Sequence, residues 1–201
     1  MYKLDKLNYL FQDLEPFIDT HTMGLHYKKH AQKYLDNLNK ILKDNNYNQN
    51  VPLEYIYKDI NNFKEDIRED LLFNLGGVVN HNLYFKSISK TKTLPKGKLL
   101  NLVINKYKNI DNFLNEIIKS ALSIKGSGYV FVILNKNHNL EIITKQNQQS
   151  PLLQGNIPIF NIDMWEHAYY LNYKNNKEEY LDNLKNILDF SYANKIVDKS
   201  W

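Results

Sequence analysis

The chain has 201 residues, 43% of them hydrophobic, and 26 basic against 22 acidic residues give it a formal net charge of +4. Such a chain can bury a core as one large domain or as two small ones. It contains no cysteine, which excludes disulfides, thiolate metal ligands and cysteine nucleophiles and is typical of proteins in a reducing compartment. No apolar run is long enough to span a bilayer, so we expect a soluble, cytoplasmic protein with no membrane partner.

Nearly all of the positive charge comes from lysine, since Arg68 is the only arginine. Arginine dominates bidentate contacts to bases, and this composition therefore argues against recognition of nucleic acid. A pI of about 8.9 nevertheless leaves one rival interpretation, a basic nucleic-acid-binding module. A binding titration over rising salt would test this rival, because phosphate contacts give a steep salt dependence.

Two long helices are predicted in the first half of the chain. Apolar and aromatic residues recur at helical spacing from about 20 to 44 and again from about 63 to 87. Between them the polar segment DNNYNQNVP, at 44–52, ends in a proline and predicts a turn. The pattern indicates an N-terminal helical hairpin. The next polar segment, SKTKTLPKGK at 89–98, predicts a linker.

A boundary at this linker divides the chain into an N-terminal domain at 1–89 and a C-terminal domain at 90–201. Helices are expected near 98–107 and 110–124, and further helices at the C-terminus. Three segments between these helices have the composition of strands: GYVFVIL at 128–134, LEIITK at 140–145 and IPIFNID at 157–163. The expected fold class is α+β, a long helical hairpin followed by an α/β domain with a small three-stranded antiparallel sheet.

The first predicted helix presents His26, His30 and Tyr34 within a stripe about 80° wide. One interpretation is that one imidazole binds a metal ion while the other two side chains line its approach. The alternative is a half-buried helix face whose histidines are hydrogen-bonded and purely structural.

His81 lies on the second predicted helix, in the segment NLGGVVNHNLYF. Gly76 and Gly77 precede it and each cost about 1 kcal/mol of helix stability relative to alanine, so we expect a close contact that requires their small size. Helix packing alone would explain such a contact, and a single helical histidine is more often structural than a ligand.

The segment DMWEHAYYL, at 163–171, places Asp163 and His167 at a strand-to-helix corner, where functional groups are held on a rigid frame. A carboxylate and an imidazole four residues apart form a usable pair of metal ligands. The alternative is that Asp163 caps the helix and His167 lies on its amphipathic face. Together with the helical histidines, however, the pair completes a sulfur-free set of ligands that suits manganese, iron or zinc.

The same segment, DMWEHAYYL, resembles the D-x-W-E-H-A-Y-Y motif of the iron/manganese superoxide dismutases. Four further segments resemble that family in the correct order along the chain: LEPFIDTHTMGLHYKKHAQKYLDNLN, NLGGVVNHNLYF, KGSGYVFVIL and NQQSPL. The resemblance implies an antioxidant oxidoreductase that disproportionates superoxide to oxygen and hydrogen peroxide. Such an enzyme works by redox cycling of one bound metal ion.

Carried over residue by residue, the resemblance implies a metal site between the two domains, with four ligands: His26, His81, Asp163 and His167. His30 and Tyr34 match the gateway residues at the mouth of the substrate channel. Gln148 matches the glutamine that hydrogen-bonds the metal-bound solvent in manganese-type members. Trp165 and Tyr84 match aromatic walls of the site.

The resemblance also bears on the metal. Iron-type members carry the glutamine at the position held here by Gly77, so Gly77 with Gln148 resembles the manganese arrangement. We therefore expect one manganese ion per subunit, with iron as the alternative. The family usually has tryptophan where this chain has Tyr129 and Phe131, and manganese-type members commonly have histidine at Val78. These departures remove no ligand, but they weaken the inference that the metal is manganese rather than iron.

Glu166 and Tyr170 match residues at the family's subunit interface, where the glutamate of one chain supports the ligand histidine of the other. The resemblance therefore implies a homodimer, with a tetramer as the alternative. One rival function remains on the same scaffold, a noncatalytic zinc- or manganese-binding protein. Zinc accepts the same nitrogen and oxygen ligands and has no redox chemistry.

Overall fold

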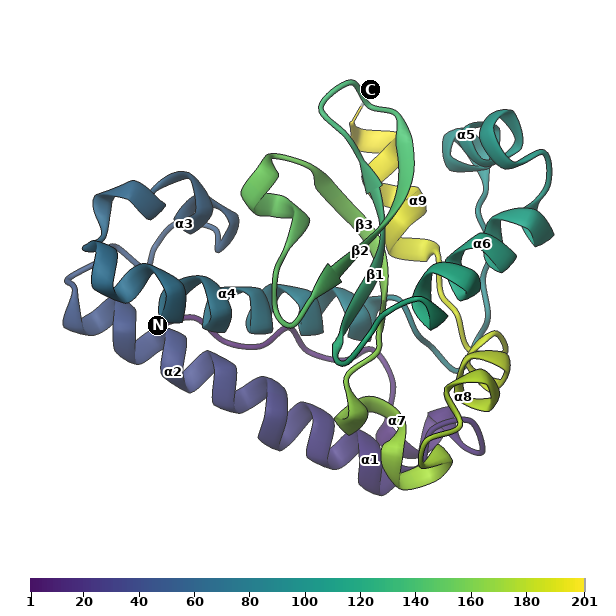
Figure 1. Ribbon diagram of the computed structural model, residues 1–201, viewed down its shortest axis with the longest axis horizontal. Helices are drawn as coiled ribbons and strands as arrows, with labels where there is room; N and C mark the ends of the chain where they lie inside the picture. The colour runs from purple at the N-terminus through teal and green to yellow at the C-terminus, as the bar shows by residue number, and fades with distance from the viewer. Residues whose placement is uncertain (201) are drawn as a thin grey trace.

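The computed structural model describes residues 1–200, and two of its long helices lie side by side in the first half of the chain (Figure 1). These helices, α2 at Gln32–Asp44 and α4 at Glu65–Lys86, pack against each other as the predicted hairpin. The connection between them holds a short helix that was not predicted, α3 at Glu54–Lys58. Five residues are too few to carry a helical period, so the polar composition around α3 predicts only a turn.

The predicted first helix is one helical segment with a widened turn inside it. Asp19 starts the segment, because its carboxylate accepts a hydrogen bond from the amide of Thr22. Helix α1, Thr20–Leu25, then leads into a π-helical turn at His26–Ala31, which continues directly into α2. Single π-helical turns inside α-helices are frequent at functional sites. This one begins at a candidate metal ligand.

The second half is built on a three-stranded antiparallel sheet of order β2-β1-β3. Its strands are β1 at Gly128–Leu134, β2 at Leu140–Gln146 and β3 at Ile157–Asp163, each within one residue of its predicted bounds. All seven residues of the central strand β1 are buried, as expected of a short continuous apolar run. The register pairs Tyr129 of β1 with Asp163 of β3.

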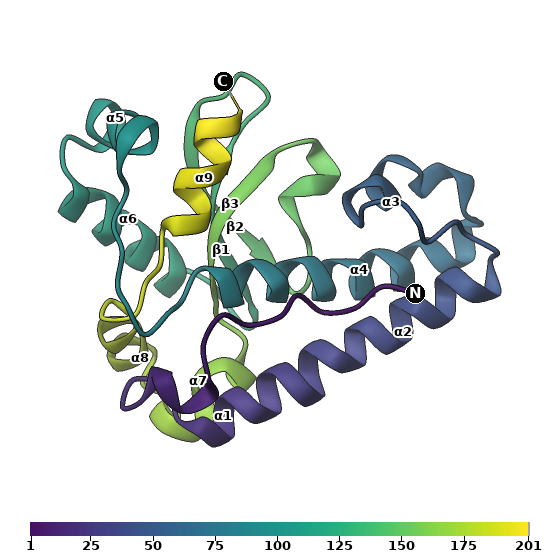
Figure 2. The ribbon, with the colours of Figure 1, turned by 180° about the vertical axis from the view of Figure 1, so that it is seen from behind.

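Helices surround this sheet. Helix α9 contacts β3, and α5 lies beside α9, as the view from behind makes plain (Figure 2). Helix α6 contacts both β1 and β2. The bounds of the C-terminal helices are α5 at Gly97–Tyr107, α6 at Ile110–Leu122, α7 at Glu166–Tyr173, α8 at Lys177–Leu184 and α9 at Ser191–Lys199.

Helix α4 joins the two halves, since it packs against α2 as well as against β3. Twelve of its 22 residues are buried, as expected of a helix covered on more than one face. The predicted fold class is correct: a helical hairpin is followed by helices around a small antiparallel sheet. In the part of the chain that the structure describes, no helix is long and apolar enough to cross a membrane.

Candidate metal centre

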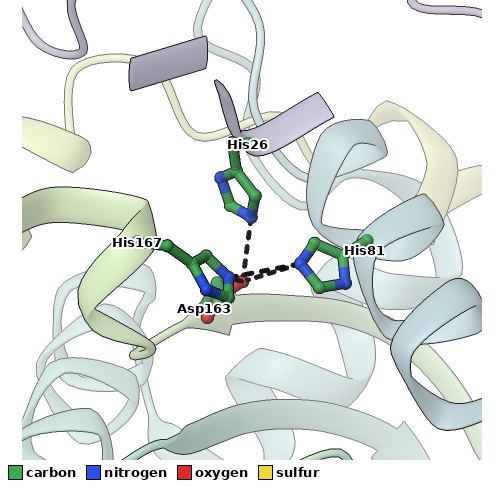
Figure 3. Close-up of side chains that lie close together, drawn as sticks. All are labelled: His26, His81, Asp163 and His167. Carbon is green, nitrogen blue, oxygen red and sulfur yellow. Dashed lines mark hydrogen bonds and ion pairs between the residues drawn. The ribbon is translucent and has the colours of Figure 1, made fainter. Parts of the chain in front are cut away.

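Four side chains from four separate elements point toward one another (Figure 3). His26 comes from the π-helical turn, His81 from α4, Asp163 from the end of β3, and His167 from the first turn of α7. Each offers one donor atom, and these four atoms lie within 4.8 Å of one another. The fold thus brings together residues that are up to 141 positions apart in the sequence (167 − 26 = 141).

The spacing of these donor atoms fits a shared ion. The Oδ2 atom of Asp163 lies 3.2 Å from Nε2 of His26, 3.7 Å from Nε2 of His81 and 3.6 Å from Nε2 of His167. The Nε2 atoms of His81 and His167 are 3.3 Å apart. Donors that each lie about 2.1 Å from one ion are separated from one another by roughly 3 to 4 Å.

The polar atoms of this cluster also need a ligand. Both ring nitrogens of His26 and the Oδ2 atom of Asp163 are buried without a hydrogen-bond partner of acceptable geometry. Buried polar atoms are nearly always paired, so such orphans require a bound group. Three nitrogens and one carboxylate oxygen suit manganese, iron or zinc, and the residues present therefore fit a metal ion.

Neighbouring groups fix the orientation of the candidate ligands. The backbone amide of Trp165 donates to Oδ1 of Asp163 at 2.8 Å, which leaves Oδ2 facing the imidazoles. Nδ1 of His81 donates to the carbonyl oxygen of Gly77 at 2.5 Å, because a carbonyl can only accept. Nε2 of His81 is thereby left unprotonated in the neutral ring, as a ligand nitrogen must be.

Burial sets the protonation states of the cluster. It lowers the pKa of His26 to about 4 and holds the pKa of His81 well below its ordinary value, so both rings are neutral at neutral pH. Burial pushes the pKa of Asp163 upward, but the imidazoles of His167 and His26 beside the carboxylate outweigh it and hold that pKa below its usual range. Neutral imidazoles beside an ionised carboxylate are the forms that bind a metal ion.

We expect the metal-free protein to lose stability as the pH falls from about 6.5 to about 4. His26 has a pKa of about 4 when folded and 6.5 when unfolded, so the unfolded chain binds more protons within this window. The linkage lowers the free energy of unfolding by on the order of 3 kcal/mol for this group alone. Urea unfolding of the metal-free protein at pH 7 and pH 4.5 measures the effect.

Two substitutions control for this prediction. His26→Gln should weaken the pH dependence, whereas His21→Gln, at an exposed histidine, should leave it unchanged. Equal unfolding midpoints at the two pH values in the parent protein would contradict the prediction.

His30 and Tyr34 lie at the mouth of the cluster. The ring of His30 stacks on that of His167 with centroids 4.3 Å apart, and the ring of Tyr34 lies 5.4 Å from that of His81. Both residues line an open cavity of about 800 Å³. Its rim carries three lysines, Lys29, Lys33 and Lys40, as well as Asp70. An anion would thus approach the cluster past a rim with a net positive charge.

Gln148 is buried beside the cluster, where its Nε2 atom donates to the hydroxyl of Tyr34 at 3.2 Å. Gln148 and Tyr34 can lie here because each packs directly against a glycine of α4. A Cβ atom on Gly76 would lie 1.8 Å from the carbonyl oxygen of Gln148, and one on Gly77 would lie 2.3 Å from Cγ of Tyr34. The two glycines therefore have the role predicted from their unfavourable effect on helix stability: they allow Gln148 and Tyr34 to approach α4 closely.

Aromatic rings surround the cluster. The ring of Trp165 stacks on His167 at 5.5 Å, and its Nε1 atom donates to the carbonyl of Asn147. Tyr84 lies 5.3 Å from His26 and is fully buried. These walls exclude water from one side of the candidate ligands, which strengthens the electrostatic interactions there.

Two buried hydroxyl groups near the cluster were not predicted from the sequence. The hydroxyl of Tyr180 donates to the backbone carbonyl of Asp163 at 3.1 Å. The hydroxyl of Tyr129 lies 3.5 Å from Nδ1 of His81. Tyr180 belongs to no motif and has no signal in the sequence, whereas Tyr129 is noticeable only as a departure from the family's tryptophan.

Glu166 and Tyr170 do not join the cluster within the chain. Both side chains are exposed at α7, and Tyr170 keeps 47% of its surface accessible to solvent. An exposed aromatic and an exposed carboxylate next to the half-buried candidate ligand His167 leave a surface available to a second subunit.

A helical hairpin packed on a small antiparallel sheet, with three imidazoles and a carboxylate converging, defines an α+β fold with one candidate metal centre among the described residues. Residues 1–89 match the α-hairpin domain of the iron/manganese superoxide dismutases, and residues 95–196 match their C-terminal domain. The chain belongs to this family of oxidoreductases.

Curated relatives agree over nearly the full length. The manganese superoxide dismutase of Listeria innocua is 35% identical over 198 residues, which cover 98% of each chain. That of Buchnera aphidicola is 35% identical over 195 residues, covering 94% of this chain and 93% of the relative. A relative from Methylomonas sp. named as a Mn/Fe superoxide dismutase is 34% identical over 195 residues, covering 96% of each chain.

Proposed function

We propose that the chain is a superoxide dismutase, which converts two superoxide anions and two protons into oxygen and hydrogen peroxide. The observation that carries the proposal is the convergence of four donor atoms in a chain of this family. His26, His81, Asp163 and His167 would hold the ion. Bound there, manganese or iron would supply the alternating oxidation and reduction of superoxide.

The chain's own residues would bring in the anion and supply protons. The cavity lined by His30 and Tyr34, whose rings contact those of His167 and His81, would bring an anion past lysines toward the cluster. The hydroxyl of Tyr34 accepts a hydrogen bond from Gln148, so its own hydrogen is free to be donated elsewhere. Burial raises the pKa of Tyr34 above its ordinary value, with the bond from Gln148 opposing, and the hydroxyl therefore keeps its proton at neutral pH.

Manganese is the metal we propose, with iron as the alternative. Gln148 reaches the cluster from the loop after β2, whereas the ring of Tyr34 covers the place where a side chain on Gly77 would begin. This is the arrangement that the resemblance described above associates with manganese-type members. Relatives named as manganese or Mn/Fe superoxide dismutases support it. Val78, where manganese-type members commonly have histidine, packs with Leu71 and Leu75 in the core of the hairpin.

The metal content of protein purified from its source tests this proposal. We expect close to one manganese or iron ion per chain together with turnover of superoxide. Stoichiometric zinc without turnover would instead support the noncatalytic rival.

The domain boundary and the compartment belong to the same proposal. We place the N-terminal domain at 1–89 and the C-terminal domain at 90–201, with the metal ion between them. Candidate ligands drawn from both sides of the linker support this division.

The proposed compartment is the cytoplasm, because the sequence has no cysteine and no long apolar run. Fractionation of the source cells tests this proposal.

The assembly we propose is a homodimer in which Glu166 of each chain supports His167 of the other. Glu166→Ala should then weaken dimerisation at least about tenfold and also reduce metal retention, because one charged hydrogen bond serves both. Analytical ultracentrifugation together with metal analysis of the purified variant measures both effects.

Glu178→Ala is the matched control, because Glu178 is also exposed and lies in the first turn of the next helix, α8. It should behave as the parent protein does. A Glu166→Ala protein that stays fully dimeric, metallated and active would rule out the interface role.

A further inference from the structure

Tyr180 is a fully buried residue of α8 that contacts elements carrying the candidate ligands without being a ligand itself. Its hydroxyl donates to the backbone carbonyl of Asp163 at 3.1 Å, at the end of β3. The same hydroxyl lies 3.1 Å from that of Tyr84, a fully buried residue of α4, which also carries His81. Tyr180 therefore joins β3 and α4 through one oxygen atom.

The ring of Tyr180 contacts a third element. It stacks on the ring of Tyr169 with centroids 5.1 Å apart, and it lies 5.7 Å from the ring of Tyr173. Both of these tyrosines belong to α7, whose first turn supplies His167. Helix α7 is thus packed against the same side chain that is bonded to β3 and α4.

The fourth candidate ligand is reached through the neighbours of Tyr180. The ring of Tyr84 lies 5.3 Å from that of His26, the ligand on the π-helical turn. The hydroxyl of Tyr173 donates to the carbonyl of Phe17, shortly before α1, which leads into that turn. Three of the four elements that supply ligands therefore contact Tyr180 directly, and its partners contact the fourth.

We propose that Tyr180 is a positioning residue whose hydroxyl and ring hold the four ligands at the spacing that binds the ion. This inference rests on the proposed function and deepens it, because it names a residue outside the motifs on which retention of the ion depends. The four donor atoms come from separate elements, so their spacing is only as fixed as the packing of those elements. Loss of a group that orients a ligand costs about 10- to 100-fold in metal affinity.

The alternative is that Tyr180 only fills the core. The two hypotheses differ in what the hydroxyl does, because Tyr180→Phe keeps the ring and its packing on α7 but removes both hydrogen bonds. If the residue only fills the core, the variant loses folding stability at most, and its folded form binds manganese as the parent does. If it positions the ligands, the folded variant also loses affinity for the ion.

The test measures the manganese affinity of the full-length protein by competition with a chelator, at a temperature where circular dichroism shows each variant to be fully folded. We expect Tyr180→Phe to bind manganese about tenfold more weakly, at the lower end of the effects of such groups. The visible absorption of the oxidised ion should shift as well, since it reports the arrangement of the ligands.

Tyr84→Phe gives a graded second variant. It removes the bond between the two hydroxyls but leaves the bond from Tyr180 to Asp163, so we expect a smaller loss of manganese affinity, about threefold. It decides the question by itself if Tyr180→Phe does not fold, because unchanged affinity in Tyr84→Phe would then overturn the proposal.

Tyr2→Phe is the control. The hydroxyl of Tyr2 also donates to a backbone carbonyl, that of Val51, at 2.8 Å, and neither segment supplies a candidate ligand. Its removal should leave the manganese affinity and the spectrum unchanged. A loss of affinity in Tyr2→Phe as large as that in Tyr180→Phe would overturn the proposal, since loss of any such hydroxyl would then be enough.

The outcomes separate this inference from the proposed function. A parent protein that binds manganese but does not turn over superoxide would remove the proposed function, and the affinities of the variants would still decide the role of Tyr180. Unchanged manganese affinity and an unchanged spectrum in folded Tyr180→Phe, beside a parent that turns over superoxide, would overturn the positioning role alone.

Discussion

His81→Ala should give a folded protein that has lost its metal ion and its activity. His81 supplies one of four converging donor atoms, and alanine has no atom that can replace its Nε2. Because loss of groups that merely support a ligand already weakens metal binding 10- to 100-fold, we expect more than about a hundredfold loss from removal of the ligand itself. The fold should survive, since α4 keeps a large set of other buried residues. Elemental analysis, circular dichroism and a superoxide assay on one preparation measure the three properties.

Val78→Ala is the matched control for this variant. Val78 is fully buried in the same helix but packs in the core of the hairpin, away from the four donor atoms. It should cost on the order of 1 to 3 kcal/mol of stability and leave the metal content unchanged. Full metal occupancy in His81→Ala would show that His81 is not a ligand.

Gly76→Ala should be among the most destabilising single methyl additions in the chain. The new Cβ atom would lie 1.8 Å from the carbonyl oxygen of Gln148, and a backbone atom cannot rotate away as a side chain can. The same carbonyl accepts a hydrogen bond from Nδ2 of Asn80, so moving it would break a buried contact. We expect a loss of about 3 kcal/mol or more in the free energy of unfolding, at the upper end of overpacking effects. Urea unfolding measures it.

Gly24→Ala provides the opposite expectation for the same chemical change. Its Cβ atom would meet only the ring of Phe11, at 3.9 Å, within the helical conformation of α1. Alanine should therefore be neutral there or stabilise the protein by up to about 1 kcal/mol. Equal effects at Gly76 and Gly24 would show that the close approach of Gln148 is not the cause.

The fold could be predicted well from the sequence wherever an element has a period or a clear boundary. The long helix α4 has a helical period and β1 is a continuous apolar run with clear boundaries, whereas α3 is too short to have a period. The π-helical turn at His26 could not be predicted, because the widened turn changes the hydrogen bonding without interrupting the apolar pattern.

The residues of the candidate site likewise divide into those that the sequence predicts and those that only the fold brings together. The residues of DMWEHAYYL are close in sequence, and their motif predicted both Asp163 and His167 as ligands. The contribution of Tyr180 depends on how α8 packs against the cluster, which leaves no mark on local spacing. The hydroxyl of Tyr129 was visible only as a departure from the family's usual tryptophan, because its place beside His81 depends on tertiary packing.

Turnover of superoxide by the metal-free protein reloaded separately with manganese, iron and zinc tests the central claim most directly. Stopped-flow decay of superoxide should accelerate with manganese, or with iron, in proportion to the metal bound at one ion per chain. Zinc should bind the same four residues without activity, since it has no redox chemistry. Stoichiometric binding of manganese and of iron with no acceleration by either would contradict the proposed function, whatever the geometry of the cluster.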